Sequence, residues 1–310
     1  MAGRMPRPLR LDYPGAIHHV YNRGNYRQDV FAMAGAARAF ETCVFEACER
    51  CDWRLHAYTT MTNHYHLALE TPRGNLVAGM QWLQSTYASR FNRFRKERGH
   101  LFQGRYGAVL VEPGEALLRV VNYIHLNPVK AKLVTVDQLA QYPWSSFRRF
   151  VGGARPGFLV CEDWLAELEL VDNAVGWASY RSYLTFLSAN DDEQRRQAFD
   201  RMSKGWAVGS PEWRQEVALV QSARVEQLQG EATRELKEVR WARVLKELLK
   251  QAGRTRADVA RDAYGAEWKV RIAAELRRTT TATNAWIARE LVMGCRSSVS
   301  VYLSQRKFKN

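Results

Sequence analysis

Short segments with the patterning of strands alternate with amphipathic segments in the first half of the chain. The strand-like segments lie at 16–23, 53–60, 64–70 and 105–112. Apolar residues three and four positions apart predict helices at 34–51, 76–98 and 115–127. The order βαββαβ plus a helix predicts an α+β, ferredoxin-like domain. Its antiparallel sheet would carry helices on one face and leave the other face open.

Two histidines fall on one face of the third predicted strand. Side chains alternate along a strand, so Tyr65, Leu67 and Leu69 would pack inward while His64 and His66 project together from the other face. A lone pair of histidines on a strand is often satisfied by a carbonyl or a neighbouring side chain. Two imidazoles on an open sheet face are nevertheless a candidate metal site.

The helix predicted at 115–127 adds a tyrosine and an amide. Its end at Asn127 is expected because Pro128 disfavours α geometry in the residue before it. Tyr123 and Asn127 are then neighbours on one helical face, about 5–6 Å apart at Cβ. A tyrosine beside an apolar helical stripe usually packs. Together with two histidines and an amide, it could instead attack a phosphate held by a divalent cation.

Breaks in the pattern predict three parts. The regular pattern ends around 142–146, and the segment 152–157, rich in glycine and proline, resembles a linker. We expect a catalytic domain at 1–150, a helical connecting region at 151–235 and a basic helical domain at 236–310. Tryptophans and tyrosines in the connecting region are expected to form core, so no chemistry is assigned to it.

The charge of the chain favours a polyanionic partner. The formal charge is +14 and the pI is about 9.8, which places nucleic acid first and an acidic membrane surface second. Residues 236–310 carry a net charge of about +10. Within them, helices at 283–291 and 296–303 flank a turn at 293–294, as in a helix-turn-helix. The alternative is an ordinary helical hairpin. Candidate DNA contacts there are Arg289, Arg296, Ser297 and Ser298.

The chain shows neither an apolar run of membrane-spanning length nor the apolar segment of a signal peptide, so a cytoplasmic location is expected. Three cysteines, Cys43, Cys48 and Cys51, lie close enough in sequence to suggest zinc. Their spacing also matches the buried stripe of one amphipathic helix, which we prefer because free cysteine commonly packs as a small apolar residue. Disulfides are not expected in a reducing compartment.

The ordered motifs of residues 8–150 resemble those of the HUH single-tyrosine transposases, and most closely the REP-associated tyrosine transposases. The matching blocks are 15–25, 56–66, 101–106, 123–129 and 142–146. Two departures are visible: Thr62 stands where the family usually has proline, and bulky Tyr65 separates the two histidines. The helix-turn-helix segment resembles extensions found in some members.

The resemblance implies a role for each matching residue. Tyr123 would be the nucleophile, His64 and His66 metal ligands, and Asn127 the third ligand. The cofactor would be Mg²⁺ or Mn²⁺, with Zn²⁺ or Co²⁺ allowed by affinity alone. The implied enzyme cleaves and rejoins single-stranded DNA at repetitive hairpins through a 5′-phosphotyrosine. Whether it is a monomer or a homodimer stays open. Candidate DNA-binding residues in this part are Arg23, Arg90, Arg93, Arg95, Lys96 and Arg105.

Two noncatalytic alternatives remain. The βαββαβ domain could be an RNA-binding module, since 105–109 echoes part of an RNA-recognition signature, although such a reader needs stacking aromatics where this chain has histidines. The chain could also be a DNA-binding regulator that acts through its C-terminal helices. Intact Tyr123, His64, His66 and Asn127 weigh against that reading.

Overall fold

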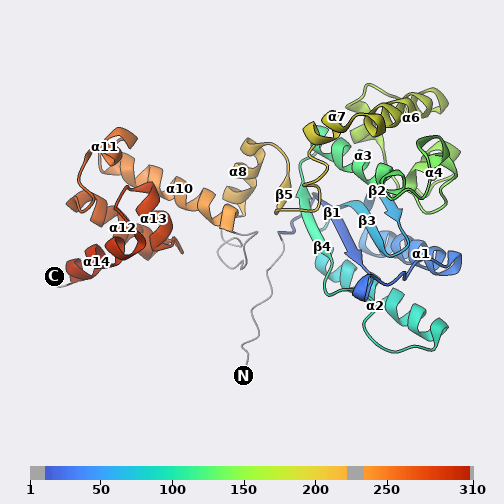
Figure 1. The fold of residues 1–310 in the computed structure, drawn as a ribbon, viewed down its shortest axis with the longest axis horizontal. Helices are drawn as coiled ribbons and strands as arrows, with labels where there is room; N and C mark the ends of the chain where they lie inside the picture. Colours follow the sequence, from blue (N-terminus) through green and yellow to red (C-terminus); the bar gives the residue numbers. More distant parts are fainter. Residues whose placement is uncertain (1–10, 222–233, 308–310) are drawn as a thin grey trace. The chain divides into compact units, whose positions relative to one another are not determined.

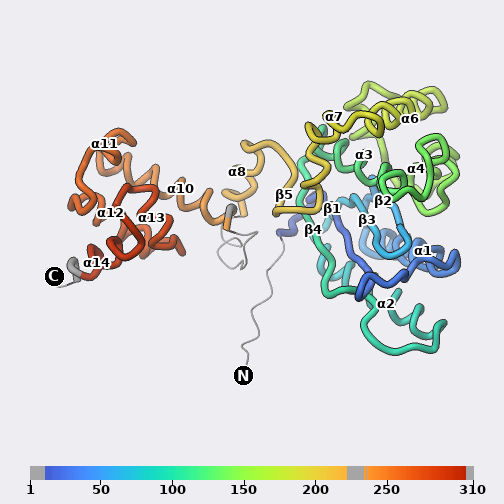
Figure 2. The backbone as a smooth tube through the Cα atoms, viewed as in Figure 1, coloured from blue at the N-terminus to red at the C-terminus, as the bar shows by residue number. Residues whose placement is uncertain are grey.

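The computed structural model describes residues 11–221 and 234–307 (Figure 2). They form two compact units: residues 12–210, and a second unit that contains the described residues from Pro211 onward. The start of the chain, on which the expectation of no leader rests, and residues 222–233, next to the predicted boundary at 235, lie outside the described residues.

The first unit is built on a mixed five-stranded sheet (Figure 1). Its elements are β1 (Ala16–Arg23), η1 (Asn25–Arg27), α1 (Ala34–Cys51), β2 (Arg54–Thr60), β3 (His64–Thr71), α2 (Leu76–Arg95), β4 (Gly107–Val111), α3 (Glu115–Lys130), η2 (Val136–Gln141), α4 (Ser146–Gly152), α5 (Glu162–Ala166), α6 (Ala174–Ala189), α7 (Asp191–Arg196) and β5 (Ala207–Val208). The strand order is β2-β3-β1-β4-β5. The first four strands pair antiparallel, which confirms the predicted ferredoxin-like arrangement. The short strand β5 pairs parallel with β4.

Helices α1 and α2 cover one face of the sheet. Tyr65 of β3 packs on this side, with its ring centroid 4.6 Å from that of Phe40 in α1, and its hydroxyl accepts a hydrogen bond from Gln84 of α2. The bulky residue between the two histidines therefore points away from them. Cys43 and Cys48 are buried in the same core, as expected from the helical stripe.

The other face of the sheet is covered, which corrects the expectation of an open face. Helix α3 crosses it and lies between the strands and α6 and α7 (Figure 1). His66 is only 5% exposed and Ala68 is fully buried. Apolar side chains line α3 on more than one side and are buried, for example Leu117, Val120 and Val121. A helix that is apolar on two sides needs a layer on each side.

Helix α3 continues past the expected end at Asn127 and includes Pro128. Proline at this place removes one backbone donor, and the helix still closes, because the amide of Ala131 donates to the carbonyl of Asn127 at 2.9 Å. The preference of the residue before proline for extended geometry is a tendency that packing overrides here. Tyr123 and Asn127 remain one turn apart on the same helix.

Helix α2 ends at Arg95, earlier than predicted, because Lys96 adopts a left-handed conformation with φ of 55°. The apolar side of this helix is buried only in part. Phe94 is 71% exposed, whereas Tyr87 is fully buried. The residues of α2 that are buried end at Tyr87, so the last turns of the helix have no layer beneath them.

Residues 151–210 complete the core of the first unit. Trp164, Trp177 and Tyr180 are buried in the same apolar cluster as the sheet and α3. The predicted linker at 152–157 therefore does not separate two compact units. The reason is the outer side of α3, whose apolar residues need the cover that this segment supplies.

The second unit is helical. Its described elements are α8 (Pro211–Val220), α10 (Arg234–Gln251), α11 (Arg256–Arg261), α12 (Glu267–Thr279), α13 (Asn284–Glu290) and α14 (Arg296–Lys307). The two helices predicted around the turn at 293–294 are present. Thr283 caps α13 by accepting a hydrogen bond from the amide of Trp286, and Gly294 supplies a positive φ of 82°. Among the described helices none is long and apolar enough to cross a membrane.

Candidate active site

The histidines of β3 line a cavity at one end of the sheet. The strand register sets His66 opposite Tyr21 and His64 opposite Arg23 of β1. The cavity measures about 440 Å³, and Arg105 and Gly107 contribute to its wall. Gly107 is required because a Cβ there would lie 2.3 Å from the Tyr21 ring. The predicted histidine pair therefore opens onto a cavity that also holds two predicted DNA contacts, Arg23 and Arg105.

Helix α3 brings the predicted nucleophile to the same histidines. The Tyr123 ring lies edge-on to His66 with 5.4 Å between centroids, and edge-on to His19 with 5.7 Å. Phe199 also packs edge-on to the tyrosine, with 5.8 Å between ring centroids. The tyrosine and the histidines come from one chain, so one chain assembles this part of the site.

Both predicted histidine ligands have one ring nitrogen engaged and the other available. Nδ1 of His64 lies 2.7 Å from Oδ1 of Asn63, and Nδ1 of His66 lies 2.9 Å from Nε2 of His19. Within the described parts of the chain, Nε2 of His64 and Nε2 of His66 have no hydrogen-bond partner. Engagement of one nitrogen by a neighbouring group is the usual state of a metal-binding imidazole. The donor set therefore fits a metal ion.

Burial keeps these imidazoles in the neutral form that binds metals. It lowers the pKa of His66 well below the ordinary value of 6.5, and the neighbouring His19 and His64 lower it further. The pKa of His64 is lowered by burial and by the charge of Arg23. Burial lowers the pKa of His19 to about 4. At neutral pH all three rings are uncharged.

Asn127 stands one turn beyond the tyrosine and is 8% exposed. Its Nδ2 donates to the carbonyl of Tyr123 at 2.9 Å, which orients the amide. Its Oδ1 accepts no hydrogen bond from any described residue. An amide oxygen is a suitable ligand for Mg²⁺ or Mn²⁺. The hydrogen bonds of the described residues do not join Asn127 to either histidine, so its part as third ligand stays a prediction.

Residues 13–127 match the family model described as "Transposase IS200 like". This segment is similar to the IS200-like transposases. The match confirms the transposase class predicted from the motifs. It ends at Asn127 and so includes His64, His66 and Tyr123. We call residues 13–127 the transposase segment.

A solved structure of a REP-associated tyrosine transposase bound to a REP hairpin is similar to part of the chain. It is 18% identical, covers 53% of this chain and 91% of its own, and has a TM-score of 0.38. No curated protein matches the chain.

Lys130 lies just beyond the transposase segment and was not predicted from the sequence. Its Nζ is 5.5 Å from the centre of the Tyr123 ring and 4.4 Å from that of Phe199. Burial lowers its pKa, while Asp191 and Asp200 oppose that shift. Lys130 follows Tyr123 by two helical turns, a spacing that in hindsight places both on one face of α3.

His19 was also missed. The sequence His18-His19 places one histidine on each face of β1. Only the pairing of β1 with β3, which sets His19 opposite Ala68, brings its ring within hydrogen-bond distance of His66. Met202, whose carbonyl accepts a hydrogen bond from Nδ1 of His19 at 2.8 Å, lies in a segment to which no chemistry was assigned. Its position carries no periodic signal that could have indicated this contact.

The basic residues predicted on α2 lie away from the histidines. Arg90 pairs with Glu46 of α1 at 2.9 Å, on the face of the sheet opposite the site. Arg95 pairs with Glu97 at 2.9 Å, while Arg93 and Lys96 are exposed. The structure does not bring these four cations to the cavity, and their contact with DNA stays a prediction.

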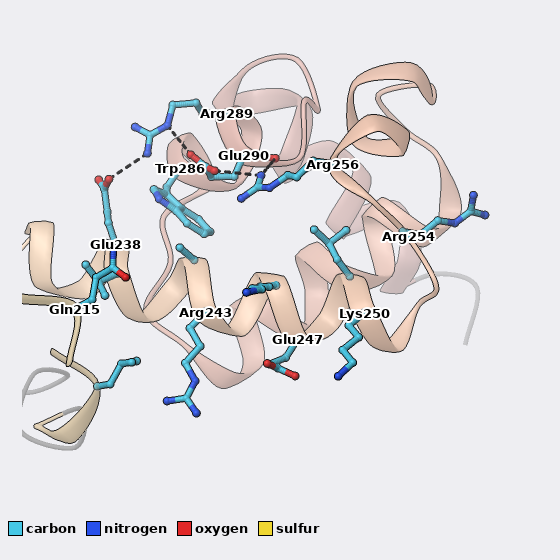
Figure 3. A pocket seen from close by; sticks show the side chains of 15 residues that line it. Gln215, Glu238, Arg243, Glu247, Lys250, Arg254, Arg256, Trp286, Arg289 and Glu290 are labelled. Atoms are coloured by element: carbon cyan, nitrogen blue, oxygen red, sulfur yellow. Dashed lines mark hydrogen bonds and ion pairs between the residues drawn. The ribbon is translucent and has the colours of Figure 1, made fainter. Parts of the chain in front are cut away.

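A basic groove of about 1180 Å³ crosses the second unit (Figure 3). Exposed cations of α10 contribute to it: Arg243, Lys246 and Lys250. None of the three has an ion pair among the described residues. On another wall, Arg289 pairs with Glu238 and Glu290 (Figure 3). The predicted contact Arg289 is thus already paired with carboxylates. The three cations of α10 were not predicted from the sequence.

The second helix of the predicted helix-turn-helix begins with the other candidate contacts. Arg296 and Ser297 are exposed, and Ser298 accepts a weak hydrogen bond from the amide of Cys295 at 3.4 Å. These positions are open to a partner at the start of α14. Their contact with DNA stays a prediction.

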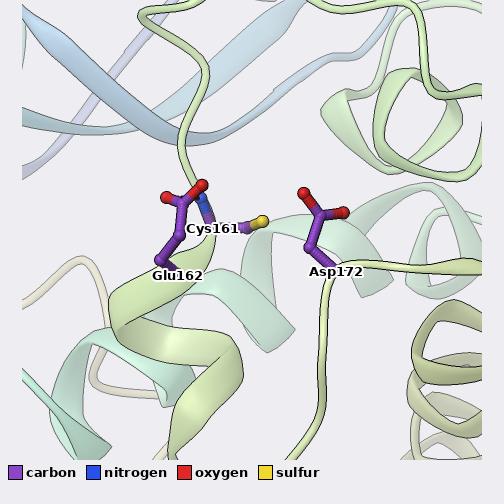
Figure 4. A group of neighbouring side chains, drawn as sticks. All are labelled: Cys161, Glu162 and Asp172. Atoms are coloured by element: carbon purple, nitrogen blue, oxygen red, sulfur yellow. Dashed lines mark hydrogen bonds between the residues drawn. The ribbon is translucent and has the colours of Figure 1, made fainter.

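A second group of ligand-type side chains, Cys161, Glu162 and Asp172, lies far from the histidines in sequence (Figure 4). Arg155 pairs with Asp172 and lies 3.7 Å from Glu162. Burial raises the pKa of the Cys161 thiol to about 12. A protonated thiol and carboxylates already paired with arginine make a structural ion-pair cluster, since metals bind the thiolate.

Proposed function

We propose that this protein is a metal-dependent endonuclease and strand transferase for single-stranded DNA. Its substrate would be a repetitive hairpin element, as the resemblance of its motifs to REP-associated tyrosine transposases implies. One observation carries the proposal: Tyr123 of the transposase segment lies edge-on to His66 at 5.4 Å within a single chain. A nucleophile beside a neutral imidazole with a free ring nitrogen suits attack on a metal-held phosphate.

Three side chains would hold the metal ion. His64 and His66 would bind through Nε2, because Nδ1 of each is already engaged. Asn127 would bind through Oδ1, because its Nδ2 donates to the helix backbone. Mixed nitrogen and oxygen ligands suit Mn²⁺ or Mg²⁺. Bound there, the ion would polarise the scissile phosphate and offset its negative charge.

Tyr123 would attack the phosphorus through its phenolic oxygen. The new bond joins this oxygen to phosphorus and the bond from phosphorus to the 3′ oxygen breaks. The phenol loses its proton and the leaving 3′ oxygen takes one up, so the leaving strand ends in a 3′-hydroxyl. Arg23 and Arg105 border the cavity and would hold neighbouring phosphates. Lys130 places a positive charge near the tyrosine ring. There it would stabilise the negative charge of the phosphate that Tyr123 attacks. Attack by another 3′-hydroxyl reverses the step and rejoins DNA.

The second unit would hold the hairpin stem. Arg243, Lys246 and Lys250 line its groove without ion pairs among the described residues, and such cations bind backbone phosphates regardless of sequence. The RNA-binding alternative is less well supported. An RNA reader displays stacking aromatics on an accessible sheet face, whereas here α3 covers that face and His66 is 5% exposed.

The test uses single-stranded hairpin DNA from beside the gene, incubated with the full chain and Mn²⁺. DNA labelled at its 3′ end should leave its label on the protein in a denaturing gel. DNA labelled at its 5′ end should release a free fragment that ends in a 3′-hydroxyl. Peptide mapping should place the adduct on Tyr123.

Two results would contradict the proposal. One is transfer of the 5′ label to the protein, which would reverse the polarity of the link. The other is hairpin binding without any adduct at saturating Mn²⁺ and DNA, which would favour the noncatalytic alternative.

A further inference from the structure

We propose that His19 is a positioning residue that, together with the carbonyl of Met202, fixes the proton of His66 on Nδ1 and so leaves the lone pair of His66 on Nε2. Its consequence for metal binding rests on the proposed function. The arrangement of protons itself does not, and can be tested in the metal-free protein.

The carbonyl oxygen of Met202 can only accept a hydrogen bond. Nδ1 of His19 lies 2.8 Å from that oxygen, so it must carry the proton. A neutral imidazole has one proton, so Nε2 of His19 is an acceptor. This Nε2 lies 2.9 Å from Nδ1 of His66, which must then be a donor. His66, itself neutral, is left with its lone pair on Nε2.

The tautomer set in this way is the less common one. A free neutral imidazole side chain prefers its proton on Nε2, the position that a metal would need. A histidine that binds metal through Nε2 therefore gains from a partner that holds the proton on Nδ1. His19 is fully buried, so water cannot take over its part.

The acceptor comes from a strap, residues 199–203, that lies outside the transposase segment. Two further contacts hold the strap against the site. The hydroxyl of Tyr21 donates to the carbonyl of Ser203 at 2.7 Å, and Phe199 packs on Tyr123 with 5.8 Å between centroids. Met202 is 1% exposed. The strap therefore packs as part of the site. Its sequence lies about 70 residues beyond Asn127, the last residue that the family model matches.

The first measurement is the tautomer of His66 in the metal-free full chain. Long-range proton–nitrogen NMR spectra of histidine-labelled protein distinguish Nδ1–H from Nε2–H, and the seven histidines can be assigned by substitution. We expect Nδ1–H for His66 in the wild type. In His19→Phe we expect a change to Nε2–H or to a mixture. Substitution His19→Gln, which offers an acceptor to His66 and a donor to Met202, should keep Nδ1–H.

The matched control is His125→Phe. His125 is also fully buried and makes two hydrogen bonds, to Tyr180 and Ser146, but it does not contact His66 through any bond of the described residues. This control should leave the His66 signals unchanged. It separates the loss of a positioning contact from the general cost of replacing a buried histidine.

The second measurement is Mn²⁺ affinity by calorimetry. His19→Phe should weaken binding by about 10- to 100-fold, and His19→Gln should restore it to within a few-fold of the wild type. If His66 carries its proton on Nε2 in the wild type, or keeps Nδ1–H in folded His19→Phe, the inference is overturned. If the wild type binds no Mn²⁺, the proposed function fails, while the NMR spectra still decide the role of His19.

Discussion

Tyr123 stands edge-on to His66 with 5.4 Å between ring centroids, although one side chain comes from α3 and the other from β3. The tyrosine ring also touches His19 and Phe199. Packing of the ring, rather than its hydroxyl, therefore holds this side of the site together. The hydroxyl can be removed without disturbing the histidines.

Tyr123→Phe should abolish cleavage and the covalent adduct, because only the nucleophilic oxygen is lost. Hairpin affinity should stay within about twofold of the wild type, since the ring contacts remain. The measurements are adduct formation on denaturing gels and hairpin binding at equilibrium. A Phe variant that still forms the adduct would assign the nucleophile to another residue.

The two predicted histidine ligands should respond differently to alanine. Both His64→Ala and His66→Ala should lower Mn²⁺ affinity and cleavage together. His66→Ala should also lower the free energy of unfolding by about 1–3 kcal/mol, because it leaves the buried Nε2 of His19 without a donor. His64 is only partly buried, so its loss should change stability little. Calorimetry with Mn²⁺ and urea unfolding test this. Unchanged binding isotherms would mean that the two histidines have a structural role and do not bind the metal.

Acid should destabilise the metal-free protein between pH 6.5 and 4. Burial lowers the pKa of His19 to about 4 and that of His125 to about 3. In this range the unfolded chain binds protons that the folded chain does not, so the free energy of unfolding falls as pH falls. The stability that the neutral buried histidines contribute is fully present above pH 6.5. His19 alone would contribute on the order of 3 kcal/mol. Urea unfolding at pH 7, 5 and 4 measures it.

The control for this pH dependence is His125→Phe, which removes one of the histidines whose pKa burial lowers. Its stability should fall less steeply with acid than that of the wild type. An equal slope would show that His125 is not neutral and buried in solution.

Lys130→Met should lower the cleavage rate about 10-fold or more at saturating DNA while leaving the fold intact. The substitution keeps the length of the side chain and removes the charge beside the Tyr123 ring. The matched control is Lys132→Met, which changes an exposed lysine just after the helix. Single-turnover rates compare the two. Equal rates for both variants would exclude a role for Lys130 in the reaction.

Replacing Arg243, Lys246 and Lys250 by glutamine should weaken hairpin binding and flatten its salt dependence. The slope of log affinity against log salt should fall by about 0.9 for each lost phosphate contact on duplex DNA. A control with the same charge change replaces Arg271, Arg277 and Arg278 of α12, which do not line the groove. Equal slopes for the two triple variants would mean that net charge alone, and not the groove, governs binding.

The periodic parts of the molecule were predictable from sequence. The strands, the helix with Tyr123 and the shared face of His64 and His66 follow from local patterns. The sequence analysis predicted that this face would be open and missed its covering by α3. The apolar residues on two sides of α3 are typical of a helix between two layers. The role of His19 depends on which strand pairs with β1, and that of Met202 on a strap without periodicity. Such contacts are set by tertiary packing rather than by local sequence.

The group that orients His19 is a backbone carbonyl, so no substitution at position 202 can delete it. Chemical variety at that position is limited only by the space around the buried side chain. The length of the chain between α7 and β5 is a different matter. One residue inserted or lost there would move the carbonyl away from His19, so this contact constrains the length of the strap more strongly than its composition.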